Sequence, residues 1–155
     1  MFELIAPKTT GGEWKEKVLY SFRSAKDGAN PNGGLIFGSK GAIYGTTSWG
    51  GGSSNCTATG YAGCGTVYKL TPPTTKGDSW VEKILHSFSR GADGASPNGG
   101  LIFDANGSLY GTAALGGKGM VWSFAFYPQR EGLGRGQKAR CTVSLVLTEP
   151  SRWLG

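Results

Sequence analysis

Oxygen-bearing side chains at turns are the first candidates for chemistry in this chain. Asp104 and Asn106 belong to an Asp-x-Asn-Gly sequence, so their side-chain oxygens stand two residues apart. Asp27 and Asp93 each begin an Asp-Gly-Ala segment. Oxygens with this spacing can bind a hard cation such as Ca²⁺. The same side chains can instead cap a turn by accepting backbone N–H bonds. The sequence therefore predicts either a Ca²⁺ site at these four residues or a set of turn caps.

Nitrogen and sulfur chemistry is limited by the residue counts. The chain has one histidine, so a Ser-His-Asp or Cys-His hydrolase would need His86 as its base. Cys56 and Cys64 share a Gly- and Ser-rich segment, and the third cysteine is Cys141. One histidine and no clustered cysteine set argue against zinc. Cys56 and Cys64 are expected to form a disulfide in an oxidising compartment and to remain free thiols in a reducing one.

These candidates lie in or beside a stretch that the chain contains twice. Asp27–Thr46 reads DGANPNGGLIFGSKGAIYGT, and Asp93–Thr112 reads DGASPNGGLIFDANGSLYGT. Over Trp14–Thr46 and Trp80–Thr112, 20 of 33 positions are identical. In this register His86 corresponds to Tyr20, which favours a surface strand residue over a catalytic base. An internal repeat of this length indicates an architecture built from one repeated unit.

Each copy has the pattern of short strands separated by glycine-rich turns. The Pro-Asn-Gly-Gly and Asn-Gly sequences are typical of tight turns, since Gly and Asn tolerate positive φ. No segment shows the apolar period of a helix, so almost no helix is expected. We therefore predict an all-β fold of β-propeller-like blades, each a four-stranded antiparallel meander. The expected strands are 15–22, 34–37, 42–47 and 66–70 in the first copy, then 81–89, 100–103 and 108–113 in the second.

The repeat also predicts the domain organisation. A two-blade domain is expected over residues 1–127, with blade one at about 14–71, blade two at about 80–126 and an extra strand at the N-terminus. Residues 50–65 contain an insertion of 12 residues if Met120 is the counterpart of Thr66. Residues 128–155 match neither copy, so they are expected to be a divergent cap or a frameshifted tail, with one possible strand at 140–148.

Charge and hydropathy limit the classes of partner that the sequence predicts. The net charge is +6, with 11 basic against 8 acidic residues in 1–127 and 5 against 2 in 128–155. The basic excess is densest in the tail, without a basic face carrying interleaved aromatics, so no nucleic-acid partner is expected. The sequence has no apolar run of 18 residues and no signal-peptide pattern at its N-terminus, so no membrane span is expected. Because propellers close with about four to eight blades, two blades predict a homo-oligomer, a fragment of a larger propeller, or an open pair of sheets.

The repeated sequence pattern resembles the GloVer tandem repeat of large bacterial secreted or surface-anchored proteins. The resemblance is carried by Val67–Pro72, Leu85–Phe88 and Asp93–Thr112, with Leu19–Thr47 as the second match, and it covers about residues 2–126. It implies an extracellular, propeller-like array, here truncated to about two repeats. It brings no catalytic residue, and this chain departs from it in having two copies, no signal and no anchor.

Two functions follow as expectations. The first is a non-enzymatic repeat module that presents a binding surface to a small molecule or a carbohydrate. Its aromatic residues are either stacking platforms or core, namely Tyr44, Trp49, Tyr110 and Trp122. The alternative is a Ca²⁺-dependent hydrolase of a small ester or lactone, by analogy with calcium-dependent lactonases of propeller architecture.

Overall fold

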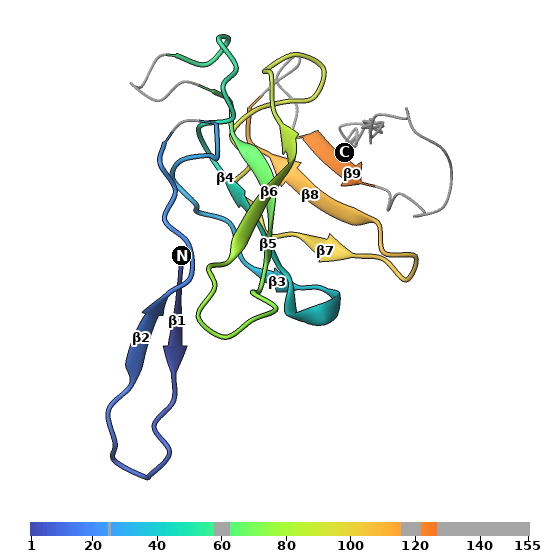
Figure 1. Cartoon of the computed structure of the whole chain (residues 1–155). Helices are drawn as coiled ribbons and strands as arrows, with labels where there is room; N and C mark the ends of the chain where they lie inside the picture. The colour runs from blue at the N-terminus through green and yellow to red at the C-terminus, as the bar shows by residue number, and fades with distance from the viewer. Residues whose placement is uncertain (25, 58–62, 116–121, 127–155) are drawn as a thin grey trace, which may run out of the picture.

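The structure, a computed structural model, describes residues 1–24, 26–57, 63–115 and 122–126. Strands and turns make up the described chain, apart from the single 3₁₀ turn η1 at Ser39–Gly41. The strands are β1 (Phe2–Ile5), β2 (Lys15–Val18), β3 (Ile36–Phe37), β4 (Ile43–Thr47), β5 (Thr66–Thr71), β6 (Val81–Ser87), β7 (Ile102–Phe103), β8 (Leu109–Ala113) and β9 (Trp122–Phe126). The prediction of an all-β fold is confirmed (Figure 1).

The strands form three antiparallel sheets. β1 pairs with β2, β3-β4-β5-β6 form a four-stranded sheet, and β7-β8-β9 form a three-stranded sheet. All pairings within the sheets join strands that are consecutive in the sequence, although β2 does not pair with β3 and β6 does not pair with β7. In the part of the chain that is described, no helix is long and apolar enough to span a bilayer. The possible strand at 140–148 and Cys141 lie outside the described residues.

The internal repeat is reproduced in the strand registers. Phe2 faces Val18 and Tyr68 faces Ile84, so the β1–β2 pairing matches the β5–β6 pairing after a shift of 66 positions. The pairing of β3 with β4 matches that of β7 with β8 in the same way. Because side chains alternate between the two faces of a strand, equal register places corresponding residues on the same strand face in both copies.

The sheets group the strands differently from the predicted blades. Blade one was expected at about 14–71, beginning with β2, but β2 pairs with β1 and the four-stranded sheet begins at β3 and ends with β6. A sequence period gives the length of a repeated unit but not its starting point. The starting point depends on which strands share hydrogen bonds.

The insertion in the first copy is also shorter than the sequence alignment indicated. Ala113 faces Trp122 where Thr47 faces Thr66, so Trp122 rather than Met120 is the counterpart of Thr66. Nineteen positions separate Thr47 from Thr66 and nine separate Ala113 from Trp122, which makes the first loop ten residues longer. Backbone pairing decides this alignment because the two sequences share few residues here.

Two apolar clusters hold the sheets together. In one, Leu19 and Phe22 of the first copy pack with Tyr68 and Leu70 of the four-stranded sheet. The rings of Phe22 and Tyr68 meet edge to face at 4.9 Å. In the other, the second copy's counterparts Leu85 and Phe88 pack with residues of the three-stranded sheet and its approach, including Leu101, Leu109 and Ala113. Each Leu-x-Ser-Phe segment therefore packs against the sheet that follows it in the chain.

Candidate functional site

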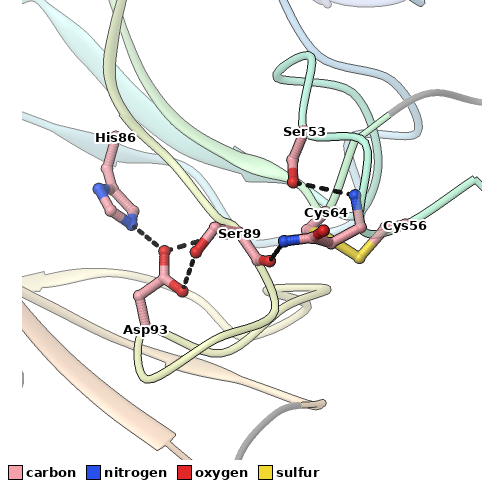
Figure 2. The surroundings of a disulfide bond; sticks show 7 residues. Ser53, Cys56, Cys64, His86, Ser89 and Asp93 are labelled. Atoms are coloured by element: carbon pink, nitrogen blue, oxygen red, sulfur yellow. Dashed lines mark hydrogen bonds and ion pairs between the residues drawn. A yellow bond between two sulfur atoms is a disulfide. The ribbon is translucent and has the colours of Figure 1, made fainter.

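The strongest candidate for catalysis is a hydrogen-bonded group at the end of β6 (Figure 2). Asp93 lies between His86 and Ser89, with its Oδ2 atom 3.2 Å from His86 Nε2. The Ser89 hydroxyl donates to Asp93 Oδ1 at 2.7 Å, and the Ser89 backbone N–H donates to Oδ2 at 3.0 Å. The His86 and Asp93 side chains are both largely buried, at 16% and 18% exposure.

The order of these three residues does not fit nucleophilic catalysis. In a Ser-His-Asp triad the serine hydroxyl bonds to the imidazole, which removes its proton. Here Asp93 stands between the two, and the Ser89 hydroxyl donates to the carboxylate. Burial lowers the pKa of His86 below its ordinary value, while the charge and hydrogen bond of Asp93 act in the opposite direction. The arrangement orders the loop between β6 and β7.

The corresponding loop of the first copy is built in the same way. Asp27 Oδ2 accepts hydrogen bonds from the Tyr20 hydroxyl at 3.2 Å and from the Arg23 backbone N–H at 2.9 Å. Tyr20 thus takes the place of His86, and Arg23 that of Ser89. Because a tyrosine serves the same purpose in one copy, the contact does not depend on the base chemistry of an imidazole.

The Asp-x-Asn-Gly turn binds its own backbone. Asp104 Oδ1 accepts the N–H groups of Asn106 at 2.9 Å and Ser108 at 2.7 Å, and Oδ2 accepts the Tyr110 hydroxyl at 3.1 Å. Desolvation raises the pKa of Asp104, but these hydrogen bonds outweigh it and leave the pKa below its ordinary value. This is the turn cap that the sequence offered as one of two possibilities.

The predicted metal ligands are distributed over three connections. Asp27 lies between β2 and β3, Asp93 between β6 and β7, and Asp104 with Asn106 in the β7–β8 turn. Among the residues described, no group of three or more His, Cys, Asp and Glu side chains is placed to hold a metal ion. The Ca²⁺ site therefore stays a prediction from the sequence.

Cys56 and Cys64 are joined by a disulfide with a Cα–Cα distance of 5.1 Å. Both are buried, at 5% and 0% exposure. The segment is also tied to the second copy, since Asn55 Nδ2 donates to the Ser89 carbonyl at 2.8 Å and the Ser96 N–H donates to the Cys64 carbonyl at 2.7 Å. The insertion thus links the two repeats.

Asp27 of the first copy and Glu82 on β6 form a pair of carboxyl groups that interact electrostatically, a pairing that the sequence did not predict. Asp27 Oδ1 and Glu82 Oε1 are both buried, and within the described residues neither has a hydrogen-bond partner. Burial, and then the charge of Asp27, raises the pKa of Glu82 to about 7. Burial also raises the pKa values of Tyr20 and Tyr68 to about 12, with Asp27 and Glu82 adding to the shift for Tyr20 and Glu82 for Tyr68. The sequence feature that could have pointed to Glu82 is the glutamate that both copies contain, at positions 16 and 82.

The carboxyl pair predicts that stability depends on pH through Glu82. Its folded pKa of about 7 exceeds the ordinary value of 4.5, so protonation stabilises the fold. This contribution is complete below about pH 4.5 and is lost as the pH rises through about 7. We expect Glu82→Gln to remove roughly 1–2 kcal/mol of pH dependence, allowing for solvent screening.

The measurement is chemical denaturation of both proteins between pH 4.5 and 8, a range chosen from the two pKa values of Glu82. Glu16→Gln is the matched control, because Glu16 is the exposed counterpart of Glu82 on β2. If wild type and Glu82→Gln show parallel pH profiles, Glu82 is not held protonated in the fold.

A polar junction, which we define as Asn32, Ser48 and Asn98, joins the two Pro-Asn-Gly-Gly turns. Asn32 Nδ2 donates to Ser48 Oγ at 3.4 Å, and Ser48 Oγ donates to Asn98 Oδ1 at 2.6 Å. Both asparagines are exposed. The backbones behind them are close, since a Cβ added to Gly33 would lie 2.8 Å from the Gly99 carbonyl oxygen. Two asparagines 66 positions apart thus meet on one surface.

The aromatic residues proposed as stacking platforms are differently placed. Tyr44 is partly buried against the core cluster and meets Phe103 edge to face at 5.1 Å, and Trp49 packs on the same cluster. The Tyr110 ring is held by its bond to Asp104. Trp122 lies on β9, at the sheet position of Thr66. Phe37, at 74% exposure, is an apolar ring on the surface instead.

In comparisons with known proteins, no protein-family model, no curated protein and no solved structure matches this chain.

Proposed function

We propose that this chain is a repeat-built binding module whose ligand contacts Asn32 and Asn98, the two exposed residues of the polar junction, which the buried Ser48 connects. The ligand class is a carbohydrate or another small hydroxylated molecule. The observation that carries this proposal is the meeting of two equivalent, exposed asparagines through Ser48. An amide side chain both donates and accepts hydrogen bonds, which suits recognition of sugar hydroxyls.

The architecture supports a multivalent surface. Each repeat supplies one Pro-Asn-Gly-Gly turn, so further repeats of the same kind would extend the row of asparagines. We also propose that the sheets are blades of a propeller-like array and that the chain is a GloVer-type module of a secreted or surface protein. The equal strand registers of the two copies support the first point. The buried disulfide supports an oxidising, extracytoplasmic location.

The junction predicts a specific loss of binding. We expect the double change Asn32→Ala and Asn98→Ala to weaken binding of an oligosaccharide identified on a glycan array by about tenfold or more, since two hydrogen-bonding side chains are removed. Isothermal titration measures the affinity. The control is Asn106→Ala, which removes an exposed asparagine side chain in the β7–β8 turn. Equal affinity of the double variant and the wild type would place the ligand elsewhere.

The Ca²⁺-dependent ester or lactone hydrolase is not favoured by any described contact. Asp104 and Asp93 both direct their oxygens to groups of their own loops and of the adjoining strands. His86 contacts Asp93 and packs edge to face on Phe88 at 4.7 Å. The Ca²⁺-dependent hydrolase activity stays a prediction from the sequence. A panel of lactones and esters assayed with and without a chelator would test it.

A further inference from the structure

The chain contains three Asn-Gly pairs, which begin at Asn32, Asn98 and Asn106. In such a pair the backbone nitrogen of the glycine can attack the side-chain amide carbon of the asparagine, because glycine has no side chain to obstruct the approach. All three asparagines are exposed, so solvent reaches each of them. The local sequence therefore gives the three pairs a similar reactivity, and the fold decides which of them reacts.

The hydrogen bonds of the glycine N–H groups differ among the pairs. The Gly107 N–H donates to the Asp104 carbonyl at 3.1 Å, and the Asp104 carboxylate accepts the Asn106 N–H at 2.9 Å. Within the described residues, the N–H groups of Gly33 and Gly99 donate no hydrogen bond. A nitrogen that already donates a hydrogen bond must lose it before it can attack. The cap of the β7–β8 turn thus protects Asn106, whereas the two Pro-Asn-Gly-Gly turns lack this protection.

The Ser48 hydroxyl distinguishes Asn98 from Asn32. Ser48 Oγ donates to the amide oxygen Oδ1 of Asn98 at 2.6 Å, but it meets Asn32 through the amide nitrogen, at 3.4 Å. Attack on the amide carbon places negative charge on Oδ1, and a donor already aimed at this oxygen stabilises that charge. Ser48 is 2% exposed, so its hydroxyl is held in position by the surrounding protein. Asn98 therefore combines an available glycine nitrogen with a polarised amide.

We propose that Asn98 is a site of spontaneous deamidation, activated by the Ser48 hydroxyl. The Gly99 nitrogen loses its proton to solvent and attacks Cγ of Asn98, so that a nitrogen–carbon bond forms and the oxyanion develops on Oδ1. The bond from Cγ to Nδ2 then breaks, and the nitrogen leaves as ammonia with a proton from solvent. Water opens the resulting succinimide to aspartate or isoaspartate. Nothing is oxidised or reduced, and water is the only co-reactant.

The modification changes the junction between the two copies. It replaces an amide, which donates and accepts hydrogen bonds, by a carboxylate, which only accepts them. It also adds one negative charge, and the isoaspartate product inserts an extra carbon into the backbone beside the close approach of Gly33 to Gly99. A hydroxylated ligand that needs the Asn98 amide then binds more weakly. This last effect rests on the proposed function, but the reaction itself does not.

The first experiment incubates the folded chain in a mildly alkaline buffer and follows the three Asn-Gly peptides by mass spectrometry. We expect Asn98 to convert about fivefold or more faster than Asn32 and Asn106, the ratio that one hydrogen bond supplies. In urea the three rates should become similar, because only the local sequence then remains. If Asn98 in the folded chain is no faster than Asn106, or if the difference persists in urea, the proposal is wrong.

The second experiment repeats the incubation with Ser48→Ala. The second copy has Ala114 at the corresponding position, so the smaller side chain is compatible with this fold. Conversion of Asn98 should slow by about fivefold, while Asn106 in the same chain keeps its rate and serves as the internal control. An Asn98 rate unchanged by Ser48→Ala overturns the activation by Ser48. Neither experiment uses a ligand, so failure here leaves the ligand-binding proposal standing.

Discussion

Replacing Phe88 by alanine is expected to destabilise the fold by about 3–5 kcal/mol, the range for a fully buried phenylalanine. Phe88 is 0% exposed and belongs to the core cluster that contains Leu101 and Leu109. Its backbone N–H also donates to the Gly65 carbonyl at 2.9 Å, which connects it to the end of the disulfide-bonded loop. The ring thus fills space where β6, the first-copy insertion and the second copy meet.

Equilibrium unfolding in urea measures this loss. Since small domains are stable by about 5–15 kcal/mol, this loss is a large fraction of the total, and the urea midpoint of the variant should fall clearly below that of the wild type. Phe37→Ala is the matched control, because Phe37 is 74% exposed and should change stability by about 0.5 kcal/mol or less. If Phe88→Ala were no more destabilised than Phe37→Ala, the second copy would not be packed on the segment after β6.

Removing the disulfide is expected to cost about 2–3 kcal/mol by the loop-entropy relation for a short loop. Cys56 and Cys64 are eight positions apart, and the double serine variant frees this segment in the unfolded chain. It also places two hydroxyl groups where the sulfur atoms are buried, which adds to the loss. The midpoint of thermal unfolding should fall, and a reducing agent should have the same effect on the wild type.

Cys141→Ser serves as the control for the disulfide, because it removes the third cysteine and leaves the Cys56–Cys64 bond intact. Its unfolding midpoint should stay at the wild-type value. A double variant as stable as the wild type would mean that the hydrogen bonds of Asn55 and Ser96 hold the loop without the covalent bond. The same result would weaken the argument from the disulfide to an extracytoplasmic location.

The two loop aspartates, Asp27 and Asp93, hold equivalent positions in the two copies but have different surroundings. Asp93 shares its two oxygens among His86 and Ser89, whereas Asp27 uses one oxygen in its loop and leaves the other buried near Glu82. The difference arises because Asp27 faces the sheet that follows the first copy, where Glu82 lies on β6. Chemistry at the loop aspartates is therefore determined by the neighbouring repeat as well as by the loop.

Local features of this protein were determined by the sequence alone. Alternating apolar residues and Asn-Gly or Pro-Asn-Gly-Gly turns specify strands and hairpins, because backbone geometry at a turn depends on the residues within it. The internal repeat likewise predicted equal units, and their registers agree. The Asp104 cap belongs to this class, since the carboxylate binds amides two and four residues ahead.

Tertiary structure alone decided which distant residues meet. The repeat period did not show that β6 completes the sheet of β3, because a period has no starting point until strands exchange hydrogen bonds. Asp27 and Glu82 are 55 positions apart, and Asn32 and Asn98 are 66 apart. Their approach depends on how one sheet packs against the next, which is determined by apolar residues such as the partly buried Phe22 and the fully buried Phe88 and not by the polar residues themselves. The candidate site therefore followed from packing that no local pattern encodes.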